Sequence, residues 1–127
     1  MEEAKEPRPT FVLMRGEYDK PDPQRPVARE LPSMFGTLGQ DQPKNRLGLA
    51  RWLVGPQNPL LLRVQANRLW EFVFGTGLVR TSEDFGLQGE WPSHPELLDW
   101  LALELRRNVH SNRQLLRLLV TSAAFRQ

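Results

Sequence analysis

The sequence contains no cysteine, only two histidines and no long apolar run. Without a thiol, the chain has no disulfide, no thiolate metal site, no cysteine nucleophile and no covalent c-type haem attachment of its own. His94 and His110 lie sixteen residues apart, a spacing that matches no common zinc motif, so we expect no metal or other cofactor. The apolar runs span only a few residues, and we expect no membrane insertion.

Familiar catalytic motifs are also missing. Gly75-Thr76-Gly77 follows a predicted helix instead of a strand, and no Gly-Lys-Ser or Gly-Lys-Thr follows it, so it does not fit a phosphate-binding loop. The chain has no Gly-X-Ser-X-Gly nucleophile elbow. These absences favour a non-enzymatic role for this chain alone.

The net charge is only +2, which argues against nucleic-acid binding as the main role. The basic excess lies after residue 43, where the sequence contains 11 basic residues and 7 acidic ones. Solvated helix faces with structural ion pairs are the simpler interpretation. The alternative is a polyanion site on four arginines near the C-terminus, namely Arg106, Arg107, Arg113 and Arg117.

Proline divides the chain near residue 43. Seven of the 11 prolines precede this point, and all four tryptophans follow it. Residues 1–9 combine glutamate and proline without an apolar anchor and are expected to form a disordered tail. Residues 10–43 are expected to be an extended, proline-rich segment packed on the domain. Within it, 10–15 reads as a short edge strand or a piece laid across helices, and 18–26 as irregular or polyproline chain.

From residue 44 the chain reads as a helical domain. Asn45 is a predicted cap for a helix to residue 54, and Asn58 precedes a helix at 60–74 that Gly75 ends. Ser93 and Glu96 have capping-box spacing before a helix to about 107, and Ser111 with Gln114 repeats that spacing before a helix to about 124. The predicted fold is therefore mainly α, a small bundle of about four helices with an extended N-terminal segment.

The last two helices carry clear apolar stripes, which we expect to form the core. In the third helix the stripe is Leu98, Leu101, Ala102 and Leu105; in the fourth it is Leu116, Leu119, Val120 and Ala123. Arg113 and Arg117 fall on the flank of the fourth stripe, where their stems reach solvent.

The second helix is apolar on two sides, which predicts neighbours on both. Arg68 falls on the side of Leu61, Val64 and Phe72. Because a buried guanidinium requires a partner, Arg68 is predicted to be a buried clamp on a loop carboxylate, most directly Asp84. With Asn67 it either ties down neighbouring chain or presents donors to an anionic or hydroxyl-rich ligand.

Residues 75–93 form a loop longer than most structureless connections, and loops of that length are often functional. Phe85, Leu87 and Trp91 are expected to anchor it to the helices. With Asn67 and Arg68, the remaining candidate site residues are Arg80, Asp84, Glu90 and His94. Asp84 and Glu90 are the alternative acid/base pair of an enzyme acting on extracellular polysaccharide, with His94 as a proton carrier.

An ordered series of motifs lies at 45–47, 50–53, 58–59, 67–70, 74–79, 84–86, 89, 92–102 and 121–127. These motifs resemble one family, the planctomycete-specific C-terminal domain of unknown function, and the resemblance covers residues 10–127. Residues 11–18 are similar to the entry of that domain. Family members usually continue past the Phe-Arg-Gln ending, so the chain is expected to be the front part of the domain.

The resemblance implies a setting without a mechanism. Such domains occur in large proteins that often carry a cytochrome-c-like domain, which implies other domains of the parent protein, including a haem domain, as partners. It also implies an exported, periplasmic or cell-envelope location. The family supplies no catalytic residues. The leading hypothesis is therefore a non-catalytic interaction or scaffold module; the polysaccharide enzyme and a nucleic-acid-binding helical module remain alternatives.

Overall fold

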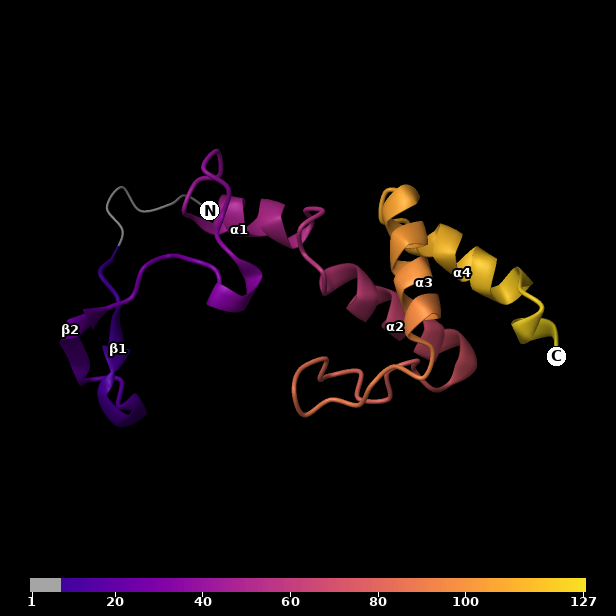
Figure 1. Ribbon diagram of the computed structural model, residues 1–127, viewed down its shortest axis with the longest axis horizontal. Coiled ribbons are helices and arrows are strands. Elements are labelled where there is room, and N and C mark those ends of the chain that lie inside the picture. Colours follow the sequence, from indigo (N-terminus) through magenta and orange to yellow (C-terminus); the bar gives the residue numbers. More distant parts are fainter. Residues whose placement is uncertain (1–7) are drawn as a thin grey trace. The chain divides into compact units, whose positions relative to one another are not determined.

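A computed structural model describes residues 8–127. The chain divides into two compact units, with the boundary in the sequence after Gly55. The first contains strands β1 (Phe11–Leu13) and β2 (Pro21–Pro26) and helix α1 (Arg46–Leu53). The second contains helices α2 (Leu61–Phe74), α3 (Pro95–Arg107) and α4 (Asn112–Thr121) (Figure 1). The predicted mainly α class is confirmed. Most of the expected tail at 1–9 lies outside the described residues.

A short hairpin opens the described chain. Strands β1 and β2 pair antiparallel, with Phe11 opposite Pro26 and Leu13 opposite Pro21. The expectation of irregular or polyproline chain at 18–26 was therefore wrong for residues 21–26, whereas residues 18–20 form an irregular turn as expected. A two-stranded ribbon leaves one side of each strand unpaired, so proline can occupy positions where no N–H donor is needed. The extended run also ends at Leu13, because Arg15 takes a positive φ of 53° in the turn that follows.

Helix α1 begins where its cap residue predicts. The side chain of Asn45 accepts hydrogen bonds from the backbone N–H groups of Leu47 and Gly48, at 3.0 and 3.1 Å. A Cβ on Gly48 would lie 2.0 Å from the carbonyl oxygen of Pro43, so only glycine fits there. Trp52 packs against Phe35, with ring centroids 5.6 Å apart.

The core of the second unit lies among α2, α3 and α4. Its buried side chains come from all three helices and from the start of the loop after α2: Leu62, Ala66, Leu78, Val79, Leu98, Leu101, Ala102, Leu105, Leu115 and Leu119. The predicted stripe of α3 is confirmed. That of α4 is rotated by about one residue, or roughly 100°: Leu115 is buried, whereas Val120 and Ala123 are exposed.

Two helix ends differ from the predictions. Helix α3 starts at Pro95 with His94 as N-cap and no side-chain cap, so the predicted capping box of Ser93 and Glu96 was wrong. The backbone N–H of Ser93 donates to the carbonyl oxygen of Leu78 at 2.8 Å, which holds this residue in the loop. Helix α4 is capped by Ser111 as predicted but ends at Thr121, because Ser122 turns to an extended ψ of 157°. None of the helices in the described part of the chain has the length and apolarity needed to cross a membrane.

Candidate functional site

The side chain of Asn67 organises the loop that follows α2. It is fully buried, at 0% exposure, although it is polar. Its Nδ2 donates to the carbonyl oxygen of Val79 at 3.0 Å and to Oγ of Ser82 at 3.2 Å, and its Oδ1 accepts from the N–H of Val79 at 2.9 Å. Ser82 in turn donates to Glu71 at 2.5 Å. Asn67 therefore performs the tethering role that one of the two sequence interpretations assigned to it.

The base of the loop is packed tightly around this amide. Leu78 and Val79 are buried in the core. A Cβ on Gly77 would lie 2.5 Å from the carbonyl oxygen of Val79 and 2.8 Å from Nδ2 of Asn67. The chain can pass this close to Asn67 only because residue 77 has no side chain.

Thr81 and Asp84 shape the middle of the loop. The hydroxyl of Thr81 donates to the carbonyl oxygen of Asp84 at 2.8 Å and accepts from the N–H of Glu90 at 2.9 Å. The carboxylate of Asp84 accepts from the N–H of Gly86 at 2.7 Å. A Cβ on Gly89 would lie 2.1 Å from the carbonyl oxygen of Asp84. The half-buried Asp84 thus has a structural role within its own loop.

The prediction of Arg68 as a buried clamp was wrong. The Arg68 side chain is 54% exposed, and its Nη2 lies 3.6 Å from Oε2 of Glu83. Its partner is therefore Glu83, instead of the predicted Asp84. The second apolar face of α2 is turned to water: Leu61 is exposed and Phe72 is 82% exposed. The partner is still a carboxylate of the loop, but the pair lies at the surface.

The remaining candidates are also at the surface. Arg80, Glu90 and His94 are exposed, and the Nδ1 atom of His94 lies 3.1 Å from Oγ of Ser93. The structure thus brings Asn67 to the backbone of the loop and Arg68 to Glu83. None of the six candidate residues lines the cavity described below.

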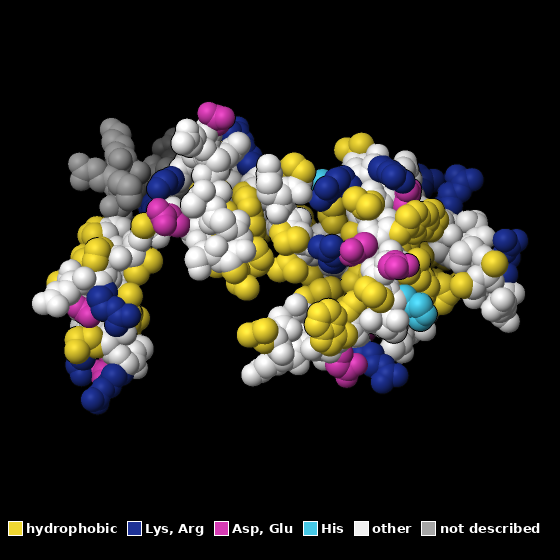
Figure 2. All heavy atoms as spheres, viewed as in Figure 1, with side chains coloured by type: hydrophobic (Ala, Val, Ile, Leu, Met, Phe, Trp, Pro, Cys, Tyr) yellow, Lys and Arg dark blue, Asp and Glu magenta, His cyan; other side chains and the backbone are white. Residues whose placement is uncertain are grey.

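The apolar residues of the loop divide into two groups. Phe85 packs against the core, as predicted. Leu87 is fully exposed and Trp91 is 92% exposed, so the prediction that they anchor the loop was wrong. We call Leu87 and Trp91 the apolar tip. Figure 2 shows hydrophobic side chains on the surface of the second unit, over the loop as well as over α3.

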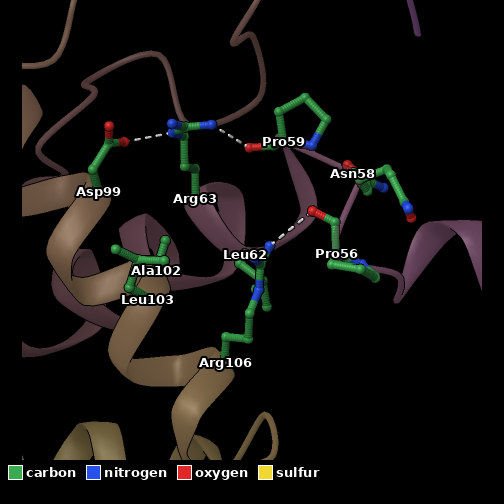
Figure 3. Close-up of a pocket in the computed structure, with 10 residues that line it drawn as sticks. Pro56, Asn58, Pro59, Leu62, Arg63, Asp99, Ala102, Leu103 and Arg106 are labelled. Atoms are coloured by element: carbon green, nitrogen blue, oxygen red, sulfur yellow. Dashed lines mark hydrogen bonds and ion pairs between the residues drawn. The ribbon is translucent and has the colours of Figure 1, made fainter. Parts of the chain in front are cut away.

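A cavity of about 270 Å³ lies between the start of α2 and the outer side of α3 (Figure 3). Arg63 and Arg106 lie on its two sides, and each donates to a carbonyl oxygen of the turn that precedes α2. Nη1 of Arg63 lies 2.6 Å from Pro59 O, and Nη2 of Arg106 lies 3.3 Å from Pro56 O. Leu62 and Ala102 give the cavity buried apolar walls.

Arg63 also pairs with Asp99 on α3, with Nε 2.5 Å from Oδ1. This hydrogen bond lowers the pKa of Asp99 and raises that of Arg63, because each charge stabilises the other. The sequence analysis missed this pair, since Arg63 and Asp99 are 36 residues apart and no local motif joins them.

A metal site finds no support in the part of the chain that the structure describes, where no three histidine or acidic side chains gather. The family model described as PSD1, protein of unknown function (DUF1553), matches residues 45–127. No curated protein and no solved structure matches the chain.

Proposed function

The chain belongs to the PSD1 family of proteins of unknown function (DUF1553), and we propose that it serves as a non-catalytic docking module of a larger envelope protein. Its partner in this proposal is another domain of the same parent protein, with a haem domain as the first candidate. The surface that makes the contact is the apolar tip, Leu87 and Trp91.

The observation that carries this proposal is a fixed loop with outward apolar side chains. Asn67 and Thr81 hold the loop backbone at several points, and Phe85 packs on the core. Trp91 and Leu87 nevertheless face water. A tryptophan on a rigid support loses little conformational entropy on binding and buries a large area, which is typical of the residues that dominate protein interfaces.

An enzyme acting on polysaccharide has less support. Glycoside hydrolysis needs two carboxyl groups on either side of a substrate groove. Asp84 is engaged with the N–H of Gly86, and the cavity between α2 and α3 contains one carboxylate, Asp99, which is paired with Arg63.

A nucleic-acid interface has less support as well. Arg107 pairs with Glu104 at 2.6 Å. Of the four arginines of the alternative polyanion site, only Arg106, Arg113 and Arg117 lack an ion pair within the described residues 8–127, and the net charge is +2. Non-specific binding to a phosphate backbone usually depends on many such contacts.

Calorimetric titration of the chain with the separately produced domains of its parent tests the proposal. Trp91→Ala is expected to weaken binding about tenfold or more, which corresponds to ~1.4 kcal/mol. Val109→Ala is the matched control, because Val109 is an equally exposed apolar residue in the turn between α3 and α4. Equal affinity of the Trp91→Ala variant and the unaltered chain for every domain would overturn the proposal.

A further inference from the structure

The cavity between α2 and α3 combines an apolar wall with an excess of positive charge. Its charged residues are Arg63, Arg106 and Asp99, which leaves one positive charge after the ion pair of Arg63 with Asp99. Leu62 and Ala102 are buried in its wall, and Leu103 borders it from α3. Such a lining suits a ligand with an apolar body and one negative charge.

The two arginines differ in how firmly they are held. Arg63 has two short hydrogen bonds, to Asp99 at 2.5 Å and to Pro59 O at 2.6 Å. Arg106 has one, to Pro56 O at 3.3 Å, which is longer than the usual range for N–H···O bonds. Arg106 has no ion pair with any residue in the described range 8–127. Of the two, Arg106 is the guanidinium that an incoming anion would engage.

The size of the cavity limits what it accepts. Pockets for drug-sized ligands typically have volumes of about 300–1,000 Å³, and this one, which is half open to solvent, has a volume of about 270 Å³. It has room for a group the size of one amino-acid side chain, and an oligosaccharide or a nucleotide would extend well outside it. Figure 3 shows the two arginines reaching from α2 and α3 toward the turn at Pro56 and Pro59, with Leu62 between them.

We propose that this cavity binds the carboxylate of a small branched aliphatic acid, with the carboxylate on Arg106 and the aliphatic chain against Leu62 and Ala102. A guanidinium binds a carboxylate through two parallel hydrogen bonds, which are stronger than its single long bond to a neutral carbonyl oxygen. The same chemistry is offered by a free acid and by a C-terminal leucine of a peptide. The proposal is independent of docking through the apolar tip.

The test is an NMR titration of the chain with 4-methylpentanoate, followed through the methyl groups of Leu62, Ala102 and Leu103. Saturable shifts confined to these methyl groups are expected. The uncharged 4-methylpentanamide is expected to bind at least about tenfold more weakly, because it cannot form the charged pair. Equal binding of the acid and the amide would contradict the proposal.

Variants of two arginines separate a built site from general surface charge. Arg106→Gln is expected to abolish the preference for the acid, and Arg106→Lys to retain part of it because the positive charge remains. Arg113→Gln removes the same charge from the exposed side of α4 and is expected to change nothing. If Arg113→Gln weakens the binding as much as Arg106→Gln does, the cavity is not the site.

The source of the carboxylate is decided by a second ligand, the acetylated tripeptide Ala-Ala-Leu with a free C-terminus. Tighter binding of the tripeptide than of 4-methylpentanoate would support the proposal and assign the site to a peptide C-terminus. Tighter binding of 4-methylpentanoate would support the proposal and assign it to a free acid. Methyl shifts that neither ligand saturates would overturn it.

Discussion

The amide of Asn67 hydrogen-bonds both backbone groups of Val79, its Nδ2 to the carbonyl oxygen at 3.0 Å and its Oδ1 to the N–H at 2.9 Å. Both residues are buried. One side chain on α2 therefore replaces the partner strand that a buried backbone segment would otherwise need. Through this contact the loop keeps a fixed backbone while Leu87 and Trp91 face solvent.

Replacing Asn67 by alanine is expected to be strongly destabilising. Two buried backbone groups of Val79 would lose their partner, and each such group costs about 1–3 kcal/mol. Urea denaturation measures the loss. Gln65→Ala is the control on the same helix, because Gln65 makes one exposed hydrogen bond to Asn112 at 3.3 Å. A loss for Asn67→Ala no larger than that for Gln65→Ala would refute the role assigned to Asn67.

Gly77→Ala is expected to cost about 1–3 kcal/mol, the usual effect of overpacking a tight site. The new Cβ would lie 2.5 Å from the carbonyl oxygen of Val79. Gly39→Ala is the matched control, since its nearest neighbour would be the Cγ atom of Gln42 at 3.8 Å. Thermal unfolding compares the two variants. Similar unfolding midpoints for Gly77→Ala and Gly39→Ala would show that the backbone around residue 77 accommodates the new Cβ without a loss of stability.

Arg68→Ala and Glu83→Ala are each expected to change stability by less than ~0.5 kcal/mol, because both side chains are exposed and their atoms are 3.6 Å apart. The double variant completes a mutant cycle in urea, and a coupling below ~0.5 kcal/mol is expected. A coupling of several kcal/mol would mean that the pair is desolvated in solution.

Asp99 is expected to titrate below its ordinary pKa, because its main interaction is the hydrogen bond from Arg63. A lowered folded-state pKa contributes stability above the unfolded value of about 3.9, and this contribution is lost as the pH falls through the folded-state pKa. Arg63→Gln should raise the pKa of Asp99 toward the ordinary value, as followed by NMR of its carboxyl carbon. Arg113→Gln serves as the control, and an unchanged pKa of Asp99 in Arg63→Gln would exclude the ion pair in solution.

Local signals were sufficient to predict most helix ends. Three side chains near helix starts accept hydrogen bonds from backbone N–H groups no more than three residues away, namely those of Asn45, Asn58 and Ser111. Gly75 ends its helix through its own positive φ. Each interaction therefore lies within a few residues of the sequence. The start of α3 was predicted to within one residue, but its cap was not, because Ser93 bonds to Leu78, fifteen residues away, instead of capping the helix.

Burial on α2 was harder to predict. A helix that is apolar on two sides does not indicate which side has neighbours, and here the side with Phe72 and Arg68 faces water. Asn67 was recognised as a tether in one interpretation, but its partner Val79 is set by how the loop returns to the helix. The cavity was missed entirely, since Arg63, Asp99 and Arg106 come together only when α2 and α3 pack.

The docking proposal places the chain in a longer protein, and hydroxyl-radical footprinting of Trp91 in the separate chain and in that proposed parent protein tests it most directly. Tyr18 is the internal reference for radical dose within the chain, because its side chain is also highly exposed. Burial of Trp91 in an interface predicts at least about fivefold slower oxidation in the parent protein, as expected for a desolvated interface residue. Oxidation of Trp91 at the same rate in both proteins would contradict the account.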